Sequence, residues 1–302
     1  MADENDEDLS TQKPGTIWFA VYVTEFVVIF TINAFTISAF ARNHHLRKRT
    51  TYLIINLTVA DLLVGAVAGP LSAFYINTEN GTGFSWREFF TRTVESIFPL
   101  ASQINLSLIS LERLHATLYP FRHCLIGKLL YFKIIICSWL VVVPLSFVMV
   151  GLALYVIRLP AYATPSYTVL TLLILTISYA IITANVKKNP LPQHLGSVVS
   201  DRKLSVTLFI VTVASILTIL PFAIRISIPD DTWLNLFPDP SDHITEAVSV
   251  LYCANSIVNP LIYAIRMREF SKAVKELIVG KTPESRRVQP IEPLGMQCMN
   301  SN

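Results

Sequence analysis

Residues Leu108 to His123 read LISLERLHATLYPFRH. The stretch begins as an apolar helix, and where the apolar run ends an acid, Glu112, stands directly before an arginine, Arg113. A carboxylate and a guanidinium at the end of a membrane span are costly unless both have partners, so this pair predicts a functional site. The alternative is that the two side chains reach the membrane surface and cap an ordinary membrane helix.

The composition indicates a membrane protein without nucleotide chemistry. Charged residues make up 15% of the 302 residues and the mean hydropathy is +0.51, whereas a soluble domain carries about 25% charged residues. The sequence has only 10 glycines and no phosphate-loop pattern, and its four cysteines show neither metal-ligand spacing nor an extracellular pair. It contains no serine–histidine–acid constellation. We therefore expect neither an enzyme nor a nucleic-acid-binding protein.

Seven stretches are long and apolar enough to cross a lipid bilayer, which takes about 20 residues. After the last of them, apolar residues recur at helical spacing between Arg268, Lys272 and Lys275, a pattern typical of a helix that lies on a membrane surface. The expected fold class is an all-α membrane protein, a seven-transmembrane helix bundle with a short amphipathic eighth helix. The predicted spans are 17–41, 50–76, 88–119, 130–155, 166–188, 202–227 and 243–266. The predicted organisation is an extracellular N-terminal segment (1–16), a seven-transmembrane domain (17–267), an amphipathic helix (268–280) and a flexible cytoplasmic tail (281–302).

The charges of the connections between the spans predict the orientation. Lysine and arginine gather in the first, third and fifth connections, whereas the N-terminal segment and the sixth connection are acidic. Because cytoplasmic loops carry an excess of Lys and Arg, the N-terminus is expected outside the cell, in a chain that crosses the plasma membrane repeatedly. This orientation makes Asn80, in the sequon Asn80-Gly81-Thr82, a glycosylation candidate. No basic segment or cleavage site precedes the first span, which is expected to direct insertion itself.

Polar motifs lie inside several of the apolar spans, where lipid alone would not tolerate them. They occur in the first, second, fourth and seventh spans: Asn33, Asn56-Leu57-Thr58-Val59-Ala60-Asp61, Trp139 and Asn255-Ser256-Ile257-Val258-Asn259-Pro260-Leu261-Ile262-Tyr263. Taken alone, each has an ordinary explanation, such as a hydrogen bond between helices or a proline kink. Together with the Glu112–Arg113 pair they resemble, over nearly the whole chain, the motifs of rhodopsin-like (class A) G-protein-coupled receptors. Leu114 stands where that family usually has a tyrosine.

The resemblance implies a cell-surface receptor that binds an extracellular small-molecule or peptide ligand and activates heterotrimeric G proteins through outward movement of the sixth helix. Two alternatives stay open. One is a receptor-like protein that binds a ligand or a partner receptor and signals weakly. The other is a transporter or channel, which would be expected to show internal repeats, broken helices and a continuous polar path. None of these is visible in the sequence.

The resemblance also assigns a two-state switch to one end of the bundle. Arg113 would pair with Glu112 and, across to the sixth span, with Asp201, as in the ionic lock of this family. Breaking that lock would open a cavity for a G protein, and two tyrosines would stabilise the arginine in the open state. The residues implied in this switch are Glu112, Arg113, Tyr179, Asp201, Asn259, Pro260 and Tyr263.

A second implied site lies in the middle of the membrane. The aspartate of the second span lines an allosteric sodium pocket in this family, and the corresponding positions here are Asp61, Ser102, Asn255 and Asn259. All four side chains carry oxygen, and a sodium ion or a proton would settle the charge of Asp61. The alternative is a polar network without an ion. No other cofactor is expected.

The chain departs from the family pattern at several positions. Ile219 stands where the sixth span usually carries a tryptophan, and Thr171, Gln103 and Ser215 replace an apolar relay. We expect these three polar side chains to form a hydrogen-bonded cluster, the alternative being that each bonds a carbonyl of its own helix. The second outer loop, about 156–165, is short and lacks the usual cysteine. This loop and the seventh span most resemble the melanocortin, adenosine and cannabinoid branch.

Glu95 is the first candidate for ligand binding. It lies eighteen residues before Arg113, which is five helical turns or roughly 27 Å along the same helix face. Amine receptors of the family carry an aspartate there. The carboxylate would pair either with the ammonium of an amine ligand or with Arg92, one turn away. The other candidates for ligand contacts are Tyr252 in the seventh span and Thr164 in the second outer loop.

Overall fold

The computed structural model describes residues 14–43, 46, 51–71, 86–155, 160–188, 196–228, 232–233, 243–266 and 268–279, and almost all of these residues are helical. In chain order, the elements are α2 (Pro14–Arg42), α3 (Thr51–Leu63), the π-helical turn η2 (Val64–Ala68), α5 (Trp86–Leu118), α6 (Pro120–Leu125), α7 (Lys128–Tyr155), α8 (Pro160–Lys188), α9 (Gly196–Ser227), α11 (His243–Arg266) and α12 (Arg268–Ile278).

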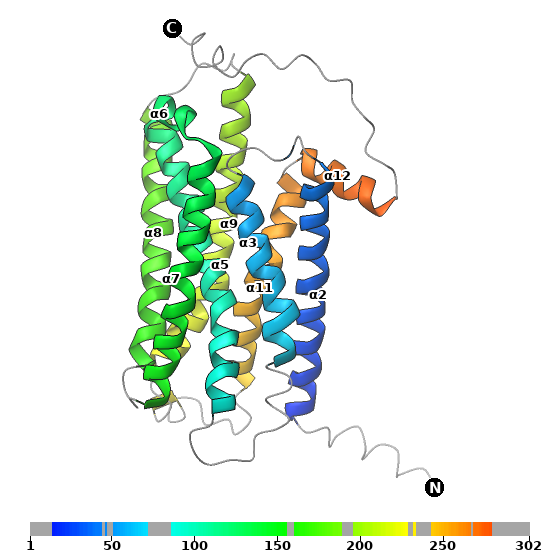
Figure 1. The fold of residues 1–302 in the computed structure, drawn as a ribbon, viewed down its shortest axis with the longest axis vertical. Helices are drawn as coiled ribbons and strands as arrows, with labels where there is room; N and C mark the ends of the chain where they lie inside the picture. The colour runs from blue at the N-terminus through cyan, green and yellow to red at the C-terminus, as the bar shows by residue number, and fades with distance from the viewer. Residues whose placement is uncertain are drawn as a thin grey trace.

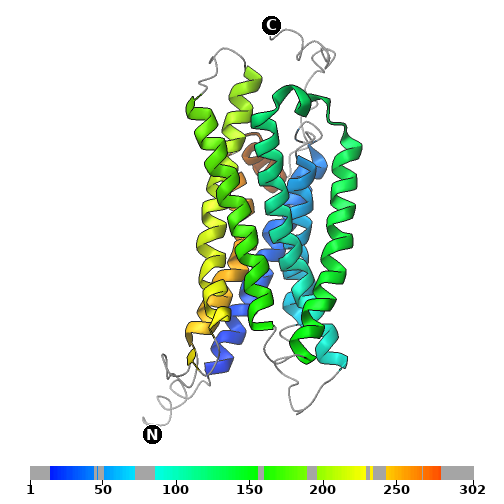
Figure 2. The ribbon, with the colours of Figure 1, turned by 90° about the vertical axis from the view of Figure 1, so that its left-hand side faces the viewer.

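Seven helical segments in the described part of the chain are long and apolar enough to cross a membrane. Figures 1 and 2 show the long helices side by side in one bundle. The short α6 and α12 lie at one end, called the α6 end below, and α2 begins at the opposite end (Figure 1). The predicted fold class, an all-α bundle of seven membrane spans, is confirmed.

Two helices begin six residues earlier than the apolar pattern predicts. α8 starts at Pro160 instead of 166, and α9 starts at Gly196 instead of 202. Hydropathy marks only the part of a helix that lies in hydrocarbon, whereas the backbone hydrogen bonds of a helix continue into polar sequence. Residues from 160 onward in the expected loop 156–165 are therefore helical, and the prediction of a loop there is wrong.

The distribution of side chains is the reverse of that in a soluble protein. Large apolar side chains cover the outside of the bundle, among them Leu140, Leu217 and Ile265, each at least 66% exposed. Polar side chains such as Asn33 and Asp61 are fully buried between the helices. In water this arrangement would be costly, but in a bilayer the apolar exterior faces lipid and the polar interior is shielded from it.

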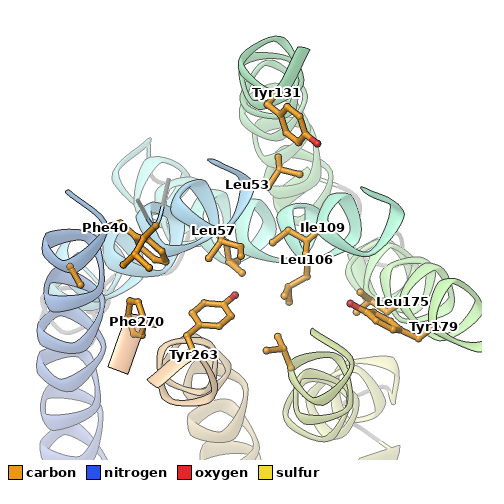
Figure 3. Close-up of a cluster of buried hydrophobic side chains, with 14 of the residues drawn as sticks. Phe40, Leu53, Leu57, Leu106, Ile109, Tyr131, Leu175, Tyr179, Tyr263 and Phe270 are labelled. Atoms are coloured by element: carbon orange, nitrogen blue, oxygen red, sulfur yellow. The ribbon is translucent and has the colours of Figure 1, made fainter. Parts of the chain in front are cut away.

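The α6 end of the bundle is closed by a cluster of buried apolar and aromatic side chains from most of the helices (Figure 3). One of them, Phe270, belongs to α12 and is 1% exposed. Its ring lies 5.2 Å from that of Phe40 in α2 and 6.4 Å from that of Tyr263 in α11. Because Lys272 and Lys275 of the same helix are exposed, α12 is attached to the bundle through one face only.

A close contact between α2 and η2 depends on a glycine. A Cβ atom at Gly65 would lie 2.6 Å from the backbone nitrogen of Phe30 and 2.7 Å from the backbone oxygen of Phe26. Small residues are the usual way in which membrane helices bring their backbones together. Gly65 therefore sets the distance between these two helices, and the π-helical turn in which it lies was not foreseen from the sequence.

Candidate functional site

The acid and arginine that end the apolar part of α5 form a buried cluster. Arg113 is 3% exposed, and its Nε donates a hydrogen bond to Oε2 of Glu112. The other carboxylate oxygen, Oε1, accepts a hydrogen bond of 3.1 Å from the hydroxyl of Tyr131 in α7. The same oxygen lies 3.3 Å from Nε2 of His123 in α6. One carboxylate thus joins α5, α6 and α7, and Arg113 does not reach toward solvent.

Two buried hydrogen-bonding groups beside this cluster have no partner within the described residues. They are Nη2 of Arg113 and the hydroxyl of Tyr263, whose side chain is fully buried in the cluster of Figure 3. Tyr179 of α8, in the same cluster, is hydrogen-bonded to Thr212 of α9. Buried polar groups are normally satisfied, so groups left without a partner indicate an arrangement that can change. Asp201 lies in α9, and its side chain is outside the described part of the structure.

A second polar centre surrounds Asp61, which is fully buried. Its Oδ1 accepts hydrogen bonds from the hydroxyls of Ser102 in α5, at 2.7 Å, and Ser256 in α11, at 2.9 Å. Its Oδ2 accepts one of 2.9 Å from the side-chain amide of Asn259. The structure therefore brings together three of the four predicted sodium-pocket residues and adds Ser256, which the sequence analysis missed.

The fourth predicted member, Asn255, turns to a different partner. Its Oδ1 accepts a hydrogen bond of 3.3 Å from Thr218 in α9. It lines, with Ser102 and Ser256, a cavity of about 20 Å³ whose other lining residues include Val64, Gln103 and Tyr252. That volume is about enough for one water molecule.

The oxygen-bearing side chains hydrogen-bonded to Asp61 fit a small hard cation. Oδ1 of Asn259 is buried and accepts no hydrogen bond from any described group. Carboxylate, amide and hydroxyl oxygens are the ligands that hard cations take. A sodium ion would also compensate the charge of Asp61 if that carboxyl is ionised, since an unpaired charge inside a membrane is costly.

Known proteins show similarity to this chain. The model of the family described as 7 transmembrane receptor (rhodopsin family) matches residues 32–157, which contain Asn33, Asp61, the Glu112–Arg113 pair and Trp139. Over these residues the chain is similar to the rhodopsin family of seven-transmembrane receptors.

Two relatives match this chain to different extents. Dopamine receptor 2 of Drosophila melanogaster is 36% identical over 119 residues, which are 39% of this chain and 22% of the relative. Histamine H2 receptor of Cavia porcellus is 27% identical over 299 residues, 86% of this chain and 80% of the relative. The match thus spans less than a quarter of the first relative and most of the second. Both relatives are receptors, which agrees with the expectation that the chain is not an enzyme.

The motif residues in the middle of the receptor connect its helices. Asn56 in α3 donates a hydrogen bond of 2.7 Å to Oδ1 of Asn105 in α5 and accepts one of 3.0 Å from the indole of Trp139 in α7. Asn33 in α2 donates one of 3.0 Å to the backbone oxygen of Ser256 in α11. These polar residues therefore fix how the spans pack against one another.

The expected cluster of Thr171, Gln103 and Ser215 is not formed as predicted. Nε2 of Gln103 donates a hydrogen bond of 3.1 Å to the hydroxyl of Tyr252 in α11. The hydroxyl of Ser215, in α9, is fully buried and has no hydrogen-bond partner among the described groups. Which residue Gln103 reaches depends on the rotation of α5 relative to its neighbours, and that rotation is not visible in a residue count along one span.

The predicted ligand contacts lie toward the end opposite α6. Glu95 is partly buried on α5. Arg92 forms an ion pair with Glu88, at 2.9 Å and one turn earlier in α5. Tyr252 stacks on Phe222 of α9, with ring centroids 4.3 Å apart. Thr164 lies in α8, but its side chain is outside the description, and so is Asn80 with its sequon.

Proposed function

We propose that this receptor resides in the plasma membrane, binds an extracellular ligand and activates heterotrimeric G proteins through outward movement of α9 at the α6 end. The charges of the connections support an orientation with the α6 end in the cytoplasm and the N-terminus outside. The observation that carries the proposal is the arrangement at the end of α5. Arg113 is buried, held by Glu112, and its buried Nη2 has no hydrogen-bond partner among the described residues.

The arrangement supports a switch between two states. In the described state the carboxylate of Glu112 is shared by Arg113, Tyr131 and His123, so three elements hold it in place. In the active state Arg113 would leave Asp201 and turn toward Tyr179 and Tyr263. The hydroxyl of Tyr263 has no partner among the described residues, and its oxygen could accept a hydrogen bond from the guanidinium of Arg113. A ligand that binds the active state better would shift the population toward it.

Sodium at Asp61 is the proposed stabiliser of the inactive state. Asp61, Ser102, Asn255 and Asn259 would hold the ion, with Ser256 as the added member, and the ion would supply only charge compensation. Binding at ten times the dissociation constant would stabilise the folded receptor by about 1.4 kcal/mol.

Replacing an organic cation by sodium in the buffer is therefore expected to raise the Tm of the purified receptor by about 2–5 °C. The measurement is a thermal melt in lipid nanodiscs, with potassium as the ionic-strength control. Asp61→Asn should melt at the same temperature in sodium and in potassium. A sodium shift of equal size in that variant would mean that the ion binds elsewhere.

The proposed ligand class is a small amine whose ammonium pairs with Glu95. The names of the two relatives give amines, dopamine and histamine, as their ligands. Arg92 forms an ion pair of 2.9 Å with Glu88, one turn before it in α5. Tyr252 and Thr164 are proposed as further contacts. The placement near the melanocortin, adenosine and cannabinoid branch stays a prediction.

The test is G-protein dissociation in cells that express the receptor, measured with a panel of amines. In Glu95→Gln, an amine that acts through Glu95 should need a concentration about tenfold higher or more to give the same response, because a charged hydrogen bond is lost. Glu88→Gln, which removes the other carboxylate of the same helix end, should leave the response near its original concentration. A receptor that reaches the cell surface but responds to nothing and has no basal activity would instead favour the weakly signalling alternative, consistent with Ile219 in place of a tryptophan.

A further inference from the structure

A groove opens toward the lipid between α2 and α11. Its volume is about 600 Å³, within the range of small-molecule sites. The side chains that line it are apolar or small, with one exception, the carboxylic acid Glu25. Among its apolar lining residues are Ile17, Val21, Val28, Val250 and Ile257.

Glu25 differs from Asp61, which also lies inside a membrane span. The side chain of Glu25 is buried, 8% exposed, and neither carboxylate oxygen has a hydrogen-bond partner among the described residues. Asp61, by contrast, accepts three hydrogen bonds. An ionisable group inside a membrane is costly, and it is normally paired with an opposite charge or a donor. Within the described part of the chain, Glu25 therefore lacks the partner that its position requires.

The neighbouring polar groups of the same two helices are already engaged with each other. The hydroxyl of Tyr22 donates a hydrogen bond of 2.7 Å to Glu246, and the indole of Trp18 donates one of 2.8 Å to His243. These contacts join α2 to α11 nearer the outer end of the spans. Glu25 lies nine residues into its 27-residue span, roughly 14 Å from that end. A partner can thus reach it through the groove from the bilayer.

We propose that this groove binds a lipophilic amine that enters from the lipid, with its ammonium on Glu25 and its hydrocarbon against Val21, Val28 and Val250. A carboxylate without a partner selects a positively charged hydrogen-bond donor, and the apolar walls select a hydrocarbon. An anionic or strongly hydrated ligand fits neither requirement. This site is separate from Glu95 and does not depend on the proposed signalling function.

A second copy of the receptor is a poorer occupant. The residues of α2 that face lipid beside the groove are apolar, and include Val27, Phe30 and Phe35. Two copies that packed through this face of α2 would bring no positive charge to Glu25. The charge requirement therefore favours a small cation over a second helix bundle.

The test uses dodecylamine with a photoreactive diazirine at the end of its chain, added to the purified full-length receptor in phosphatidylcholine nanodiscs. After illumination, mass spectrometry locates the labelled peptides. The amine should label residues 16–28 and 250–257, and dodecanol with the same diazirine should label them about tenfold less, because it cannot supply a charged donor. No G protein is needed, so the result is independent of the proposed signalling.

Three variants sharpen the result. Glu25→Gln keeps the shape and should lower labelling by the amine about tenfold to the level of the alcohol. Val28→Trp should fill the groove and abolish labelling, whereas Val27→Trp adds the same bulk to a neighbouring residue that is 59% exposed to lipid and should not change it. Equal labelling by amine and alcohol, or undiminished labelling of Glu25→Gln, would overturn the proposal. Cross-links between two copies through this face of α2 would also overturn it. The same holds if the amine labels the unaltered receptor no more than it labels Val28→Trp.

Discussion

Replacing Arg113 with alanine is expected to abolish ligand-stimulated G-protein activation while the receptor still reaches the cell surface. Arg113 is buried at the α6 end. Among the described side chains, it forms an ion pair with Glu112, which compensates its charge. In the proposed active state the guanidinium leaves this arrangement and contacts tyrosines and the G protein. Losing a charge-assisted contact that is made only in the active state should lower G-protein activation by about tenfold or more.

The measurement is G-protein dissociation at matched surface expression. Arg42→Ala is the matched control, because it removes an exposed arginine from the end of α2 without altering α5. The fold should survive Arg113→Ala, since Glu112 keeps its contacts with Tyr131 and His123. Full stimulated activity in the Arg113 variant would show that the cluster at the end of α5 is structural and would remove the main support for the proposed switch.

Replacing Gly65 with alanine is expected to destabilise the receptor by about 1–3 kcal/mol, the usual cost of forcing extra volume into a packed interior. The added Cβ would meet backbone atoms of Phe30 and Phe26 at 2.6 and 2.7 Å, and backbone cannot move aside as a flexible side chain can. α2 would have to separate from η2. The expected observation is a lower Tm of the purified receptor and less receptor at the cell surface.

Gly151→Ala is the control for this effect. It makes the same substitution in α7, but there the nearest atom to the added Cβ is 3.8 Å away, an ordinary contact. Alanine favours helix more than glycine does, so this variant should be as stable as the original or slightly more stable. If both variants melted alike, the close approach of α2 and η2 would not limit stability.

The sequence by itself determined the number and approximate limits of the membrane spans and the position of each motif within them. These are local properties, because a run of about 20 apolar residues must form a helix to satisfy its backbone in lipid. Glu112, Arg113 and Asp61 could be singled out for the same reason, since polar groups inside such a run need partners. The family motifs in this chain pointed to the receptor family that the comparisons then supported.

Only the tertiary structure decided which partners those residues have. That Tyr131 and His123 share the carboxylate of Glu112 depends on where α6 and α7 pack against α5. That Ser256 joins Asp61, while Gln103 turns to Tyr252, depends on how each helix is rotated about its axis. Rotation is set by the packing of all neighbouring helices at once, so residue spacing along a single span does not contain it. The groove at Glu25 appears for the same reason, since it lies between two helices more than two hundred residues apart in the chain.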